Sequence, residues 1–325
     1  MQKHPRGEIK FAPSSFIVQE LVLTEECQSV VPLFNGSCVP GWNGVAPVTL
    51  FHLTKTGFST EQAMTCIART LQVPKEALSY HGLKDRHALT SQCFGVEGTF
   101  HPRFWHNAIH IRQTGTSSRP LSIGGNCGNR FNIEVMTGAG SIDEAQLECV
   151  PNKFGTQRIA SKQDGEVGRL LLEGDFAGAA EAMPQKHADF HRLFHNYYTQ
   201  DEDWERAWKH HSMRFAFQFN VLKWRSWLWN ELLRIGNQEA LMTDRLPMWA
   251  PEHNRLYKKI WEPKNLNEEV AERIHRFSRT TFVRPQNISI ERIRIGWRIG
   301  FDFPSGAYAT TALSQIFELV EQPRY

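Results

Sequence analysis

The pattern of apolar and polar positions predicts strands through the first half of the chain. Residues 16–23 and 48–54 alternate or run apolar, as strands do. Residues 88–94 are apolar and β-branched enough to join a sheet. Residues 108–112 and 130–135 alternate with period two, and glycine-rich turns lie between them. We therefore expect a sheet that becomes antiparallel from residue 108.

A helix is predicted directly after residues 48–54. Ser59 is a good N-cap residue, and Gln62 follows three residues later, which is the spacing of a capping box. The apolar residues of one helical face follow: Ala63, Cys66, Ile67 and Leu71. Pro74 ends the helix. Lys55, just before it, is expected to be an exposed turn lysine, although it could lie near a site.

Residues 161–284 change from strand patterns to helical ones. Helices are predicted over 165–183, 190–198, 204–235 and 267–277. The region 204–235 mixes tryptophans with lysines and arginines. Its aromatic rings can fill a core while the cations extend outward, or the cations can form an RNA-backbone surface, and both can hold on opposite faces.

The remaining segments are simpler. Residues 27–46 are rich in Gly, Pro and Asn and predict a long loop, and a short helix is predicted over 141–149. Residues 288–303 return to a strand pattern in which apolar residues alternate with arginines. A final helix is predicted over 310–320, packed against the sheet.

Composition limits the class of protein. The chain has 325 residues, 41% hydrophobic and 22% charged, with a net charge of +3, so a nucleic-acid surface must come from local clustering. Its six cysteines contain no C-x-x-C, which argues against a structural zinc site and a disulfide scaffold. The chain shows no signal-peptide pattern and no apolar run of 18 residues. We expect a cytoplasmic monomer with no membrane span.

The most distinctive segment is the charged loop at residues 79–92. Asp85 lies between Lys84 and Arg86, and two cations should favour the ionised carboxylate and lower its pKa. An acid that stays ionised suits a nucleophile or base better than a general acid. Gly82 lets the backbone turn before it.

Two other interpretations of this loop stay open. Lys84-Asp85-Arg86 could be an ordinary solvated turn. His81, Asp85 and His87 could supply three metal ligands, as in a metal hydrolase, although no i, i+4 His pair and no Cys pair supports a metal site.

The same loop resembles the signature of a known family. Residues 82–92 fill every fixed position of G-x-K-D-x-x-A-x-T-x-Q, the signature of the TruD family of tRNA pseudouridine synthases. The matching residues are Gly82, Lys84, Asp85, Ala88, Thr90 and Gln92. The aspartate is the catalytic nucleophile in that family, so the resemblance assigns this role to Asp85.

Four further motifs resemble the family in the same order. Residues 16–20 match F-x-V-x-E, and residues 128–131 match G-N-x-F. Residues 151–160 are similar to P-N-Y-F-G-x-Q-R-F-G, but Lys153 replaces an aromatic residue and Ile159-Ala160 replaces Phe-Gly. Residues 303–310 are similar to L-P-x-G-S-[FY]-A-T, with Phe303 for Leu and Ala307 for Ser.

The resemblance implies an α+β fold. Residues 1–160 with 285–325 would form a catalytic core on a mixed, mainly antiparallel sheet. Residues 161–284 would form an inserted, mostly helical TRUD-type domain, more compact than is usual in the family. RNA would lie in a groove between the two.

The implied activity is isomerisation of a tRNA uridine to pseudouridine, with uridine 13 of a glutamate tRNA as the family precedent. The reaction moves no electrons to an acceptor and needs no cofactor or metal. The target nucleotide must leave the stem, because a stacked base cannot present its glycosidic bond to a carboxylate. The implied substrate-binding residues are Phe16, Lys84, Asn152, Phe154, Gln157, Arg158 and Tyr308. The altered 152–160 loop leaves a second hypothesis, an RNA-binding or remodelling protein of weakened activity.

Overall fold

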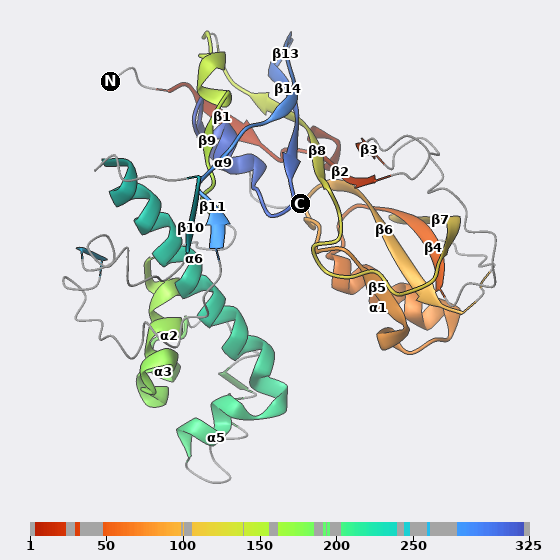
Figure 1. The fold of residues 1–325 in the computed structure, drawn as a ribbon, viewed down its shortest axis with the longest axis vertical. Helices are drawn as coiled ribbons and strands as arrows, with labels where there is room; N and C mark the ends of the chain where they lie inside the picture. The colour runs from red at the N-terminus through yellow and green to blue at the C-terminus, as the bar shows by residue number, and fades with distance from the viewer. Residues whose placement is uncertain are drawn as a thin grey trace. The chain divides into compact units, whose positions relative to one another are not determined.

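The computed structural model describes residues 4–23, 30–32, 48–98, 100, 106–138, 140–155, 162–184, 191–192, 194–195, 203–238, 244–247, 259–260 and 278–321 (Figure 1). The chain divides into two compact units. Unit 1 is Met1–Val150 with Val283–Tyr325, and unit 2 is Pro151–Phe282. The assignment of catalytic core and inserted domain to these parts stays a prediction, as does the RNA groove.

Unit 1 is built on an eleven-stranded sheet whose central order is β13-β14-β8-β2-β6-β4-β7. Its strands are β1 (Arg6–Ile9), β2 (Phe16–Leu23), β3 (Val30–Pro32), β4 (Val48–Lys55), β5 (Leu78–Tyr80), β6 (Leu89–Glu97), β7 (Ile109–Ser117), β8 (Gly128–Met136), β13 (Gln286–Ile293), β14 (Gly296–Pro304) and β15 (Glu318–Glu321). Two pairs, β1 with β15 and β2 with β6, are parallel, and the other described pairs are antiparallel. The predicted α+β class with a mixed, mainly antiparallel sheet is confirmed.

The parallel pairing of β2 with β6 brings two distant motifs together. Ile17 lies opposite Leu89, and Gln19 lies opposite Ser91. The first motif therefore runs beside the strand that leaves the Asp85 loop. This register places both motifs at one part of the sheet.

Helix α1 (Thr60–Leu71) begins as its sequence predicts. The Ser59 hydroxyl accepts a hydrogen bond from the Gln62 amide, and the Gln62 side chain accepts one from the Ser59 amide, so the capping box is confirmed. Ala63 and Ile67 are fully buried. The helix therefore packs its apolar face against the sheet that carries the loop.

Several predicted elements of unit 1 are wrong in detail. The predicted helix 310–320 is α9 (Ala309–Leu313) followed by β15, which pairs with β1. The segment 141–149 holds only a 3-10 turn at Glu144–Leu147. Strand β3 interrupts the predicted loop 27–46, most of which lies outside the described residues.

The strand predicted over 288–303 is a hairpin of β13 and β14. The chain turns at 294–295, and Gly296 follows with φ 153°. A Cβ at Gly296 would lie 2.0 Å from the Val135 carbonyl oxygen, so only glycine permits this approach of β14 to β8. Strands β7 and β8, which are consecutive, lie apart, since β7 pairs with β4 and β8 lies between β2 and β14.

Unit 2 contains the helices α2 (Lys162–Glu173), α3 (Phe176–Glu181), α5 (Trp204–Lys209) and α6 (Arg214–Gln238), with strands β10 (Arg245–Pro247) and β11 (Ser278–Thr280). Helix α2 packs along α6 and α3 (Figure 1). The single helix predicted over 165–183 is broken at Gly174, and Asp175 caps α3. The predicted helix 267–277 lies outside the described residues, as does much of 190–198.

The tryptophan-rich region supplies the core of unit 2. Trp208, Trp224 and Trp229 are each at most 2% exposed, so they fill the core, as the packing interpretation predicted. The remaining short elements are the 3-10 turns η1 (Pro13–Ser15), η2 (Lys75–Ala77) and η4 (His211–Met213), and strands β9 (Val150–Pro151) and β12 (Phe282–Val283). The chain passes between the units in β9 and β12.

Candidate active site

Asp85 forms an ion pair with a lysine far from it in the sequence. The Asp85 Oδ2 atom lies 3.0 Å from Lys10 Nζ, and the side chains are 21% and 4% exposed respectively. Lys10 follows β1 and adopts a left-handed backbone conformation with φ 57°. Its ammonium also lies 4.9 Å from the centroid of the Phe16 ring. Lys10 therefore connects the accessible carboxylate with the aromatic residue of the first motif.

The two neighbours of Asp85 in the sequence point to other partners. Lys84 Nζ pairs with Glu20 Oε1 at 2.8 Å, where the side chains are only 5% and 0% exposed. Arg86 Nε donates to the Gly57 carbonyl at 3.1 Å. The side chains of Lys84 and Arg86 are therefore used in other contacts, and the expectation that both brace Asp85 stays a prediction. The predicted substrate contact at Lys84 is thus a buried residue in an internal ion pair.

Lys55 lies under the Asp85 loop and is only 1% exposed, so the expected exposed turn lysine is wrong. Its ammonium donates to the carbonyls of Phe58 at 2.8 Å and Asp85 at 2.9 Å, with Lys84 O at 3.4 Å. Burial lowers the pKa of Lys55 to about 8; the Asp85 charge opposes this shift and the Lys84 charge adds to it.

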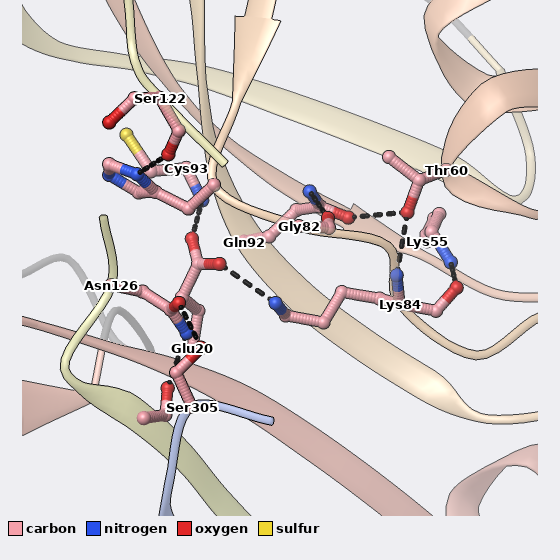
Figure 2. A network of polar contacts seen from close by, with 12 residues as sticks. Glu20, Lys55, Thr60, Gly82, Lys84, Gln92, Cys93, Ser122, Asn126 and Ser305 are labelled. Carbon is pink, nitrogen blue, oxygen red and sulfur yellow. Dashed lines mark hydrogen bonds and ion pairs between the residues drawn. The ribbon is translucent and has the colours of Figure 1, made fainter. Parts of the chain in front are cut away.

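A second group of buried polar residues holds the start of the loop (Figure 2). Thr60 Oγ1 donates to Gln92 Oε1 at 2.9 Å and accepts from the Lys84 amide at 2.8 Å. Gln92 Nε2 donates to the Gly82 carbonyl at 3.2 Å. Glu20 Oε2 accepts from the Cys93 amide at 2.8 Å. Signature residues thus serve to fix the loop that presents Asp85.

The closing motif belongs to the same unit. Tyr308 is half-buried at the start of α9, and its carbonyl accepts bonds from the amide and the hydroxyl of Thr311. Ser305 Oγ donates to Asn126 Oδ1 at 3.0 Å, which ties the motif to the segment before β8 (Figure 2). Phe16, Asp85 and Tyr308 all lie in unit 1.

Asn152 and Phe154 lie in unit 2, beside an arginine that the sequence did not single out. Asn152 is 4% exposed; its Nδ2 donates to Thr280 O at 2.9 Å, and its Oδ1 accepts from Arg279 Nη2 at 2.6 Å. The Arg279 guanidinium lies 4.2 Å from the centroid of the Phe154 ring. Gln157 and Arg158 lie outside the described residues. Arg279 lies in none of the family motifs. Its short strand, β11, is recognised only in the structure, through its pairing with β10.

The alternative metal site is not formed by the described residues. His81 Nδ1 lies 3.0 Å from the Ser122 carbonyl. Within the described ranges, no three His, Cys, Asp or Glu side chains are placed to hold a metal ion.

Among the helices of the same ranges, none is long and apolar enough to cross a membrane.

The fold and the motif-bearing loop define an α+β protein with a presented carboxylate. The model of the family described as "tRNA pseudouridine synthase D (TruD)" matches residues 2–233. The chain therefore belongs to the TruD family.

Several known proteins are similar. The chain is 32% identical over 181 residues to tRNA pseudouridine synthase D of Methylococcus capsulatus, covering 52% of this chain and 45% of that protein. It is 28% identical over 178 residues to tRNA pseudouridine synthase D of Sulfurimonas denitrificans, covering 51% and 45%. The aligned part spans about half the length of these relatives.

The crystal structure of the putative tRNA pseudouridine synthase D (TruD) from Methanosarcina mazei shares the fold. The TM-score is 0.63 with 16% sequence identity, and the match covers 97% of this chain and 94% of that one. The expected fold is thus found over nearly the whole chain.

Proposed function

We propose that this chain converts a tRNA uridine to pseudouridine, with Asp85 as the nucleophile. The observation that carries the proposal is the Lys10–Asp85 pair, in which a buried ammonium holds a partly exposed carboxylate at the position of the family's catalytic aspartate. A lysine charge at 3.0 Å keeps a carboxylate ionised and oriented, and both properties suit a nucleophile.

The reaction needs only these groups and the RNA. The N-glycosidic bond breaks, the uracil turns, and a bond forms between C1′ of the ribose and C5 of the base. The proton on C5 is then lost and N1 gains a proton, so the product is an isomer of the substrate. The nucleotide flips out at a cost of a few kcal/mol. Aromatic stacking at about 1–3 kcal/mol per base offsets that cost, and Phe154 and Tyr308 are the proposed platforms.

The remaining motif residues receive supporting roles. The flipped nucleotide is contacted, at its base or its phosphates, by Asn152, Gln157 and Arg158. The Asp85 loop is held by Phe16 through Lys10 and by Lys84 through Glu20. The proposed target is uridine 13 of a glutamate tRNA. We also propose that the protein acts in the cytoplasm, as a monomer and without a cofactor.

The alternative is a family member that binds or remodels RNA without isomerising it. The bonds that Asn152 donates to Thr280 and accepts from Arg279 favour it, because an amide already paired within its own unit must exchange partners to read a base.

The deciding experiment incubates the purified chain with an unmodified glutamate tRNA transcript and maps pseudouridine by chemical labelling and primer extension. A transcript with cytidine at position 13 is the control. We expect one modified position, uridine 13. A shifted tRNA band without any pseudouridine would select the alternative, and modification elsewhere would correct the target.

A further inference from the structure

Lys55 is almost fully buried, which is rare for a lysine. It is the last residue of β4, where it lies opposite Thr90 of β6 and Ile109 of β7. Its side chain is among the largest that are fully buried. Buried lysines occur almost only where their charge is paired or their donors are used. The contacts of this ammonium therefore indicate why the residue is there.

The donors of Lys55 match the acceptors around it. An ammonium has three N–H donors and no acceptor. Lys55 faces three carbonyls. One, that of Phe58, belongs to the turn before α1, and the other two, those of Lys84 and Asp85, are consecutive in the Asp85 loop. The ammonium thus joins the end of β4, the entry to α1 and the loop.

The same two segments are joined a second time nearby. The Gly57 amide donates to the Arg86 carbonyl at 3.1 Å, and Arg86 Nε donates to the Gly57 carbonyl at 3.1 Å. Arg86, the residue after Asp85, is therefore bonded to the turn that follows β4 through both its main chain and its side chain. Lys55 supplies the buried member of this set.

We propose that Lys55 is a positioning residue that fixes the main chain at Asp85, while Lys10 orients the Asp85 side chain. This inference rests on the proposed function for its effect on rate. Lys55 is buried beneath the loop and acts through the Asp85 backbone, without contacting RNA. A displacement of about 1 Å at a reacting group can reduce a rate by about 10²-fold, so loss of this anchor should lower the rate of the chemical step.

The test compares Lys55→Met, Lys55→Gln and the wild type in the full chain. Lys55→Met leaves an unbranched side chain one atom shorter and removes all three donors, whereas Lys55→Gln keeps two N–H donors. Hydrogen exchange of the 82–88 amides reports the loop directly. Single-turnover isomerisation and tRNA Kd report chemistry and binding separately.

We expect faster exchange at 82–88 in Lys55→Met, a single-turnover rate at least tenfold lower, and a tRNA Kd within twofold of the wild type. The exchange and the single-turnover rate of Lys55→Gln should lie between those of Lys55→Met and the wild type. Ile67→Val in α1 is the control for general destabilisation, because Ile67 is fully buried and its apolar side chain cannot donate hydrogen bonds to the loop carbonyls. It should leave the rate unchanged at an equal loss of Tm.

Several outcomes would overturn the inference. These are unchanged exchange at 82–88 in both Lys55 variants, an unchanged rate despite faster exchange, or a rate loss that Ile67→Val reproduces. Failure of both Lys55 variants to fold would assign Lys55 to stability alone. If the wild type forms no pseudouridine, the proposed function fails, and the exchange data still decide whether Lys55 anchors the loop.

Discussion

Lys10 and Asp85 are joined by a 3.0 Å ion pair in which the lysine is almost fully buried and the carboxylate is one-fifth exposed. Lys10 holds this position with a left-handed backbone, a conformation that costs a non-glycine residue about 1–3 kcal/mol and is concentrated at functional sites. The pair therefore combines a backbone cost with an electrostatic gain at the residue proposed to react.

Removing the Lys10 charge should slow the reaction. Lys10→Met leaves Asp85 without this partner, and we expect kcat to fall by about 10²-fold, as when one preorganised charge partner is lost from an active site. Lys10→Arg keeps the charge and should lose less. Single-turnover rates with saturating protein measure the effect. Equal activity of Lys10→Met and the wild type would contradict a role for the pair.

The Lys84–Glu20 pair should contribute to folding more than to chemistry. Lys84→Met leaves the Glu20 carboxylate buried without its cation, which should cost about 3–5 kcal/mol of unfolding free energy. Adding Glu20→Leu should recover part of the loss. Urea denaturation measures both. The exposed pair of Lys75 with Glu61 is the control, since Lys75→Met should cost less than about 1 kcal/mol; similar losses at the two sites would contradict the assignment.

Lys55 predicts a specific pH dependence. Its pKa is about 8 in the folded chain against an ordinary value of 10.5. Between these values the unfolded chain holds the proton and the folded chain does not, so the contribution of Lys55 to the free energy of unfolding rises with pH across this window. The rise is on the order of 3 kcal/mol.

The measurement is the difference in unfolding free energy between the wild type and Lys55→Met, taken from pH 7 to 11. This difference should increase in favour of the wild type above pH 8. The wild-type reaction rate should fall in the same window, because a neutral amine has only two donors for three carbonyls. A difference that does not change with pH would contradict the pKa shift.

Phe154 should affect chemistry more than RNA binding. Phe154→Ala removes the proposed stacking platform and the ring beneath Arg279, so the rate should fall by about tenfold or more, while tRNA Kd changes by less than about threefold. Phe219→Ala is the control, since Phe219 is 37% exposed on α6 of the same unit. Equal losses of rate and affinity in Phe154→Ala would count against a pocket role.

Local patterns predicted those elements whose signals lie within a few residues. The Ser59–Gln62 capping box and the alternating pattern of β2 each involve only residues close together in the sequence, and both elements are found in the structure. The helix predicted over 310–320 ends early, because residues 318–321 pair with β1 from the other end of the chain. No local pattern contains that partner.

The candidate site shows the same division. A motif match located Asp85, but its partner Lys10 could not be predicted, because the sheet joins segments that are far apart in the sequence. Charges adjacent in the sequence suggested Lys84 as a partner of Asp85, whereas the Lys84 ammonium pairs with Glu20. Arg279 reaches Asn152 and Phe154 only through the fold of unit 2.

The central claim is that the Asp85 carboxylate performs the chemistry, and its most direct test is single-turnover conversion of glutamate tRNA by Asp85→Asn. The control is Asp143→Asn, because Asp143 caps an exposed 3-10 turn and asparagine caps equally well. We predict that Asp85→Asn loses at least about 10⁴-fold in rate with tRNA Kd nearly unchanged, while Asp143→Asn retains the wild-type rate. Pseudouridine formation by Asp85→Asn at the wild-type rate would contradict the account.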